Sequence, residues 1–331
     1  MLKINSIFIL LLCFSISAQA NIDAPASQAE FISLMEQKYG FDTLKLKKLF
    51  EQAIVSQTIL DAIAKPAEKK LPWYKYRDIF IQEKRIRAGL DFRKKNIDKL
   101  LEAEKRFGVP AEIITAIIGV ETFYGRNTGS YRVVDALNTL AFYYPKRADF
   151  FRNELEQFLL LTREQGFDPL SLKGSYAGAM GMPQFISSSF RHYAIDFDND
   201  KVIDIWHNAD DAIGSVANYF VEHGWQKDKP IIAKADVNGE NYKQFLGGGL
   251  EPDIHVSKLK ELGIRSNSKF ENDEKLKLLE YEFENKNEYW LAHRNFYVIT
   301  RYNHSELYAM AVFQLAMEIR KRLTQSAQVS E

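Results

Sequence analysis

Gly108–Gly125 reads GVPAEIITAIIGVETFYG, and this stretch predicts the helix that organises the rest of the chain. Pro110 stands where a first helical turn tolerates proline, and Gly125 can end the helix. One helix face collects residues at i, i+3, i+4 and i+7: Ile114, Ile117, Ile118 and Glu121. Glu121 is therefore expected inside an apolar stripe rather than on a solvated face.

A carboxyl group at such a position has unusual acid–base chemistry. Burial disfavours its charged form and raises its pKa, and the partial negative charge of the nearby helix C-terminus acts in the same direction. A carboxyl group that stays protonated near neutral pH can protonate a glycosidic oxygen, so Glu121 is a candidate general acid. The alternative is a structural glutamate that pairs with an arginine or accepts hydrogen bonds from hydroxyl groups.

A second motif, Gly174–Phe185, reads GSYAGAMGMPQF. Its small residues let a backbone or a ligand approach closely, and Ser175, Tyr176 and Gln184 add hydroxyl and amide groups among them. Helix–helix packing explains such a stretch equally well. The spacing of a phosphate-binding loop is absent.

A calcium-loop pattern begins at Asp196. Loop positions 1, 3, 5 and 9 carry carboxylates, those of Asp196, Asp198, Asp200 and Asp204. Val202 stands at position 7, where a backbone carbonyl binds the ion in an EF-hand. Lys201 replaces the usual glycine at position 6, and His207 stands where a bidentate glutamate is expected. The alternative is an acidic turn without metal. The six histidines show no zinc-ligand spacing.

Composition limits the class of protein. The chain has 331 residues, 46% hydrophobic and 27% charged, which is typical of globular proteins and of about two domains. Lys+Arg and Asp+Glu are equal at 44, and no nucleic-acid-binding module is recognisable, so nucleic acid is not an expected partner. Residues 65–106 are locally basic, with 14 basic and 7 acidic side chains, which indicates either a solvated helix face or attraction to an anionic polymer.

The first twenty residues, MLKINSIFILLLCFSISAQA, have the pattern of a secretory signal peptide. A lysine precedes a short apolar run, and the run ends in an A-x-A site that predicts cleavage after Ala20. The alternative is an uncleaved anchor helix, for which the run is short. With cleavage, no transmembrane segment is expected in the mature chain. Leu12 precedes Cys13 where lipid attachment requires a small residue, which argues against a lipoprotein. Cleavage would leave no cysteine, and hence no disulfide or thiolate site.

The remaining segments predict a mainly α (α+β) protein. Residues 21–106 have helical spacing and form an N-terminal helical lobe, and 107–229 hold the motifs above. Residues 230–288 carry β-type runs and a Gly-Gly-Gly turn, which predicts a small β-containing insertion. Within 289–323, Asn295–Arg301 is interpreted as a strand and Ser305–Leu323 as an amphipathic helix. Residues 324–331 are expected to form a polar tail.

Four motifs in one order resemble the B-type lytic murein transglycosylases, bacterial cell-wall enzymes with a goose-lysozyme-like core: GVETFYG, GSYAGAMGMPQF, DIW…DAIGSVANYF and ITRYNHSELYAMAV. The resemblance is dense over 73–225 and 289–315 and looser elsewhere. It implies a lysozyme-like helical catalytic core over 107–229, completed by 289–323. It also implies a periplasmic location, glycan strands of peptidoglycan as the partner, and other cell-wall enzymes as further candidate partners.

The resemblance also implies roles for individual residues. Glu121 matches the catalytic acid/base. Positions that line the saccharide cleft match Ser175, Gln184, Tyr219, Asn303 and Tyr308, with Tyr76 and Tyr302 as further candidates. For the tyrosines, and for Tyr219 above all, core packing with a bonded hydroxyl is the alternative. Asp211 would close the loop around a structural Ca²⁺, with Asp210 next to it as the second choice.

The implied reaction needs one carboxylate, whereas ordinary glycosidases use two. Glu121 would protonate the oxygen between N-acetylmuramic acid and N-acetylglucosamine, and its carboxylate would then deprotonate the muramyl C6 hydroxyl, which closes a 1,6-anhydro ring. The tethered hydroxyl gains from preorganisation. Two alternatives are a hydrolytic muramidase on the same fold and a non-catalytic peptidoglycan-binding scaffold that recruits other cell-wall enzymes.

Overall fold

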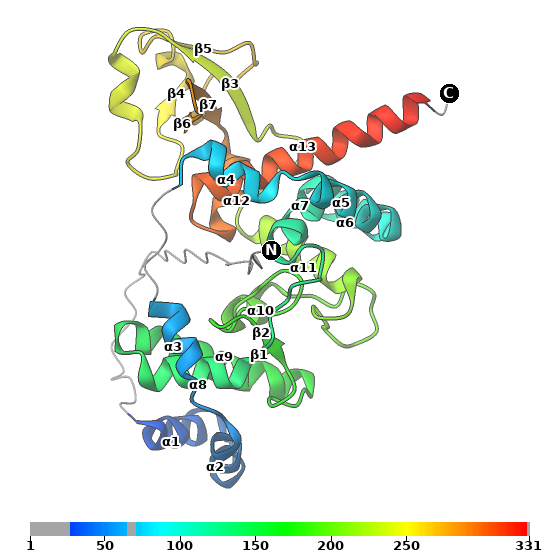
Figure 1. Ribbon diagram of the computed structural model, residues 1–331, viewed down its shortest axis with the longest axis vertical. Helices are drawn as coiled ribbons and strands as arrows, with labels where there is room; N and C mark the ends of the chain where they lie inside the picture. The colour runs from blue at the N-terminus through cyan, green and yellow to red at the C-terminus, as the bar shows by residue number, and fades with distance from the viewer. Residues whose placement is uncertain (1–26, 65–70, 330–331) are drawn as a thin grey trace, which may run out of the picture. The chain divides into compact units, whose positions relative to one another are not determined.

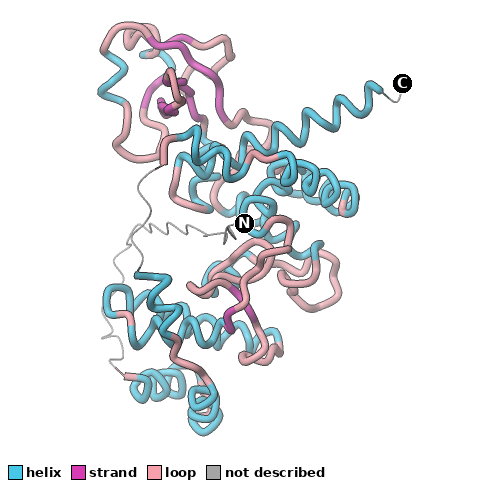
Figure 2. The backbone as a smooth tube through the Cα atoms, viewed as in Figure 1, coloured by secondary structure: helices cyan, strands magenta, loops and turns pink. Residues whose placement is uncertain are grey.

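The computed structural model describes residues 27–64 and 71–329, and over these the chain is mainly helical (Figure 2). It divides into two compact units. We call residues 27–64 and 117–219 the glutamate unit, and residues 71–116 and 220–329 the sheet unit. The predicted segments 21–106 and 107–229 each contribute to both, so the units interleave along the chain. No described helix is long and apolar enough to span a bilayer.

The glutamate unit is built from helices and one short two-stranded sheet (Figure 1). Ser27 caps the first helix, because its hydroxyl accepts from the Glu30 amide while the Glu30 carboxylate accepts from the Ser27 amide. Strands β1 (Tyr131–Arg132) and β2 (Lys173–Gly174) pair antiparallel. Its complete helices are α1 (Gln28–Tyr39), α2 (Thr43–Gln52), α3 (Gln57–Ala64), α8 (Val133–Tyr143), α9 (Ala148–Gln165) and α10 (Ser187–Tyr193). Helices α7 (Ala111–Thr122) and α11 (Ala209–Glu222) run from one unit into the other.

The sheet unit combines helices with a five-stranded antiparallel sheet of order β4-β6-β7-β3-β5. Alternating apolar side chains on β6 fill its core, and the Trp73 ring packs against Tyr281 with centroids 5.3 Å apart, which ties α4 to the sheet. Its strands are β3 (Ile232–Val237), β4 (Ile254–His255), β5 (Ile264–Arg265), β6 (Lys275–Glu282) and β7 (Asn287–Ala292). Its complete helices are α4 (Trp73–Phe80), α5 (Glu83–Lys95), α6 (Ile97–Phe107), α12 (Arg294–Tyr302) and α13 (Glu306–Val329).

Two local predictions at the C-terminal end were wrong. Asn295–Arg301, predicted as a strand, lies inside helix α12. The β-branched run Val298-Ile299-Thr300 favours a strand, but packing against α13 overrides that preference. The second error is the end of α13, which continues to Val329 rather than stopping at Leu323, so the predicted tail of 324–331 is helical as far as it is described.

Candidate active site

Glu121 lies in the last turn of α7, and only 4% of its surface is exposed. The predicted burial is confirmed, but not through an apolar stripe. Every residue of α7 is buried, so this helix has no solvated face at all. Ile117, Ile118 and Val120 precede the carboxyl group in the sequence, so the glutamate interrupts an otherwise apolar segment.

The chain leaves α7 through a strained turn. Phe123, Tyr124 and Gly125 all have left-handed φ angles, of 52°, 61° and 81°. Two successive non-glycine residues in this region are costly, and such strain persists only where surrounding contacts enforce it. The Tyr124 ring lies against Gly119, where an added Cβ would come within 2.6 Å of it, so Gly119 leaves the space that the turn requires.

The hydroxyl of Thr122 holds this turn in place. It accepts a hydrogen bond from the Gly125 amide at 3.0 Å. It can donate to the carbonyl of Met182 at 3.0 Å or to that of Ile118 at 3.2 Å. Thr122 follows Glu121 directly, so this hydroxyl connects the end of the glutamate-bearing helix to the glycine-rich segment 174–185.

Segment 174–185 is a compact loop, not a helix-packing surface. The Ser175 Oγ accepts from the amides of Ala177 and Ala179 at 3.3 and 3.0 Å, and Ser175 remains half-buried. An added Cβ at Gly181 would lie 2.5 Å from the Ile205 carbonyl oxygen, which explains one of the glycines. The absence of a Cβ at Gly181 therefore allows the backbone of this loop to approach the backbone at Ile205 closely.

Gln184 and Tyr219 are both buried in the same unit. The side-chain amide of Gln184 donates to the carbonyls of Thr128 and Gly181, at 3.1 and 2.9 Å. The Tyr219 ring packs between Phe185 and Tyr193, with centroids 5.7 and 4.9 Å away. The glutamate unit thus holds four of the predicted catalytic and saccharide-binding residues, of which Gln184 is fixed by the loop and Tyr219 by the core.

The other four predicted residues belong to the sheet unit. Asn303 ends α12, and its Oδ1 is buried without a hydrogen-bond partner among the described residues. An orphaned acceptor of this kind is uncommon in a folded protein and calls for a partner. Tyr308 is buried, the Tyr302 ring packs on Phe220, and Tyr76 lies between Trp73 and Phe80.

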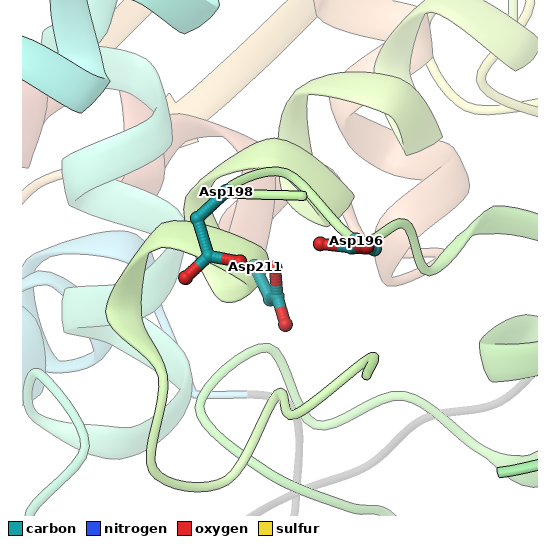
Figure 3. A group of neighbouring side chains, drawn as sticks. All are labelled: Asp196, Asp198 and Asp211. Carbon is teal, nitrogen blue, oxygen red and sulfur yellow. The ribbon is translucent and has the colours of Figure 1, made fainter. Parts of the chain in front are cut away.

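The acidic loop brings Asp196, Asp198 and Asp211 together, with one carboxylate oxygen of each within 4.8 Å of the others (Figure 3). Burial, reinforced by the carboxylates of Asp198 and Asp196, raises the pKa of Asp211 to about 6, although its oxygens accept from the Phe197 and Asp204 amides. Lys201 has a φ of 78°, the left-handed conformation that glycine supplies in an EF-hand.

Two other predicted ligands are outside this cluster. The Asp200 carboxylate accepts from the Val202 amide at 2.8 Å, and Val202 is exposed. Asp211 rather than its neighbour Asp210 joins the group of three. The donors are all carboxylate oxygens, which suit a hard divalent cation such as Ca²⁺.

A family model described as "Transglycosylase SLT domain" matches residues 24–317. The membrane-bound lytic murein transglycosylase B of Escherichia coli K12 is 41% identical over 299 residues, which are 88% of this chain and 81% of that protein. This chain belongs to the lytic murein transglycosylase B family. It is therefore an enzyme, a lytic transglycosylase of peptidoglycan, as the sequence motifs predicted.

Solved structures of lytic transglycosylases share the fold. Soluble SltB1 from Pseudomonas aeruginosa is 53% identical, with a TM-score of 0.86, and the match covers 89% of this chain and 99% of that chain. Escherichia coli Slt35 in complex with calcium is 41% identical, with a TM-score of 0.82 and coverage of 89% and 92%. SltB3 from P. aeruginosa in complex with NAG-anhNAM-pentapeptide is 27% identical, with a TM-score of 0.77 and coverage of 88% and 78%.

Sequence reasoning missed two polar side chains of this transglycosylase. Thr122 gave no signal beyond its place next to Glu121. Glu154 did give one, because it stands three residues after Phe151 and four before Phe158 on the apolar face of α9. Its buried carboxyl group accepts hydrogen bonds from the Ser188 amide and hydroxyl, at 2.9 and 2.7 Å. An acid on an apolar helix face, the pattern that indicated Glu121, can therefore also have a structural role.

Proposed function

We propose that this transglycosylase cleaves the β-1,4 bond between N-acetylmuramic acid and N-acetylglucosamine and releases 1,6-anhydromuramic acid, with Glu121 as its single acid/base. The observation that carries the proposal is the buried carboxyl group in the last turn of α7, beside a strained turn that a buried hydroxyl holds. Burial favours the protonated form that a general acid requires before cleavage.

A single carboxyl group can serve both proton transfers. Glu121 donates its proton to the glycosidic oxygen as the bond breaks, and the resulting carboxylate accepts the proton of the muramyl C6 hydroxyl as that oxygen attacks C1. The other carboxylate of α7, Glu112, forms an ion pair with Arg320 in the sheet unit and is committed elsewhere. Intramolecular attack replaces the water that a second carboxylate would otherwise have to position.

The other residues that the motifs predicted are proposed to bind the saccharide. Asn303 is best supported, because its buried Oδ1 can accept a hydrogen bond from an N-acetyl N–H or a ring hydroxyl. Ser175 keeps a hydroxyl proton to donate while its oxygen holds the loop. The side-chain nitrogen of Gln184 donates to two backbone carbonyls, and its side-chain oxygen can accept a hydrogen bond from the saccharide. Four tyrosines are proposed as further saccharide contacts: Tyr76, Tyr219, Tyr302 and Tyr308.

Replacing one carboxyl group tests the assignment. Glu121→Gln removes the exchangeable proton with little change of shape and should abolish product formation from purified peptidoglycan while retaining glycan binding. Glu154→Gln, which alters another buried acid of the same unit, should retain turnover. Turnover by Glu121→Gln, or equal loss in both variants, would overturn the role of Glu121.

We also propose that Asp196, Asp198 and Asp211 hold Ca²⁺, with Asp200 and the Val202 carbonyl as further ligands. The group of three carboxylates and the buried position of Asp211 support this, as does the calcium complex of the related Slt35. Bound Ca²⁺ would offset the repulsion among these carboxylates and link the loop to α11. EGTA should lower the melting temperature, and added Ca²⁺ should restore it; an unchanged temperature would count against the site.

Finally, we propose that the enzyme is exported to the periplasm, cleaved after Ala20 without lipid attachment, and acts on glycan strands there, with other cell-wall enzymes as candidate partners. The signal residues lie outside the described part of the chain, so this proposal is supported by the sequence pattern alone. Its relatives include a membrane-bound and a soluble enzyme. N-terminal sequencing of the protein from fractionated cells tests it, and an uncleaved or lipidated chain would contradict it.

A further inference from the structure

The sheet unit contains a cavity of about 1200 Å³, and none of the predicted site residues lines it. Helix α12 contributes to its lining, together with residues 248–253 and 269–275. The cavity exceeds the size that a single ion or a small organic molecule needs. It is lined by many charged side chains of both signs, so its chemistry differs from that of an apolar pocket.

The α12 wall is cationic and aromatic. Arg294, Tyr297 and Arg301 follow at i, i+3 and i+7, and His304 lines the cavity beyond the helix end. The guanidinium groups of Arg294 and Arg301 both lie near the Tyr297 ring, with central carbons 4.8 and 6.0 Å from its centroid. A strand would have placed Arg294 on the opposite face from the other two, so the helical conformation creates this wall.

The two loops carry carboxylates: Glu251 lies 3.6 Å from the Arg294 guanidinium group, and buried bases hold Asp253 and Glu274. Lys277 is 2% exposed, and its Nζ lies 2.7 Å from an Asp253 carboxylate oxygen. His293 is equally buried, and its Nδ1 lies 2.6 Å from Glu274. Asp253 and Glu274 both line the cavity, so their positions are fixed before any ligand arrives. Because these side chains are already held in place, binding loses less side-chain conformational entropy than it would on a mobile acidic surface.

We propose that this cavity binds a short peptide with both carboxylate and ammonium groups, which in the substrate of this enzyme is the peptide stem of peptidoglycan. Arginine side chains pair well with carboxylates, so a ligand carboxylate can replace the exposed Glu251 beside Arg294, and the fixed Asp253 and Glu274 suit an ammonium group. Tyr297 gives the peptide backbone an aromatic surface to lie against. The choice of this peptide rests on the proposed function, whereas the cavity and its charges are observed independently of that function.

Isothermal titration calorimetry of the mature enzyme with the tripeptide L-Ala-γ-D-Glu-meso-diaminopimelate, which has carboxylates and free amino groups but no sugar, tests the proposal. Arg294→Ala should weaken binding by about tenfold, the loss expected for one charged hydrogen bond. Arg294→Lys should recover part of that affinity. Arg265→Ala, which alters an exposed arginine outside the cavity, should bind like the wild type.

Three results would overturn the proposal: no binding of the tripeptide to the wild type, undiminished binding by Arg294→Ala, or equal binding of trialanine. Asp253→Asn provides a second variant, in loop 248–253 of the cavity lining, and should also weaken binding. Product analysis on peptide-free glycan separates the two proposals. Turnover without tripeptide binding refutes the peptide cavity alone, whereas tripeptide binding without turnover refutes the proposed reaction alone.

Discussion

Replacing Thr122 with valine should detach the turn after Glu121 from the glycine-rich loop. Valine keeps the branched shape but has no hydroxyl, so the Gly125 amide loses its acceptor and the Met182 carbonyl loses its donor. A fully buried unsatisfied group costs about 1–3 kcal/mol. Gly125 and Met182 are half-buried, and water can replace part of the loss, so we expect the free energy of unfolding to fall by about 1–2 kcal/mol.

The larger effect should be on catalysis. The hydroxyl holds the residue next to Glu121, and a displacement of about 1 Å in a catalytic group can cost about 100-fold in rate. We therefore expect kcat for release of anhydro products to fall by about 10- to 100-fold, with KM changed less. Thr122→Ser keeps the hydroxyl and should retain most of the activity. Wild-type kcat in a folded Thr122→Val variant would refute the positioning role.

Three further predictions concern other parts of the glutamate unit. Burial raises the pKa of Glu154 above 4.5, its ordinary value, so the folded state keeps this proton where the unfolded chain has lost it. The free energy of unfolding should fall as the pH rises from about 4.5 through the folded-state pKa, and urea titrations should show a smaller fall for Glu154→Gln. Gly181→Ala places a Cβ 2.5 Å from the Ile205 carbonyl oxygen at a φ of 66°, so denaturation should show a loss of at least about 1 kcal/mol; wild-type stability would argue against the described loop. Calcium at about 100 times its Kd should stabilise the wild type and Asp210→Ala by about 2.7 kcal/mol, but should not stabilise Asp211→Ala, which differential scanning calorimetry can measure.

The fold class could be predicted because long helices and the β-type insertion have clear periodicity. The strand predicted at Asn295–Arg301 failed for a specific reason. Three β-branched residues outweighed the helical spacing of Arg294, Tyr297 and Arg301 in a local interpretation. The packing of α12 against α13 decides between the two conformations, and such a tertiary contact cannot be read from the residues of 295–301 alone.

The candidate site was predictable where a residue breaks a pattern, and not where it supports one. Glu121 stands out as an acid in an apolar helix, and Asp196 and Asp198 follow a loop spacing. The clamp formed by Thr122 depends on the position of Met182, 60 residues later, which no local pattern reveals. The cavity beside α12 was equally hidden, because its walls come from separate segments and because the helix was predicted as a strand.

Digestion of purified peptidoglycan in 18O-labelled water tests the proposed reaction most directly. Attack by the C6 hydroxyl consumes no water, so mass spectrometry should show anhydro products that lack the label and are one water lighter than hydrolysis products. Glu121→Gln should form neither species. Products that carry 18O at the cleaved end would show that water is the nucleophile, and the single-carboxylate account of Glu121 would then be wrong.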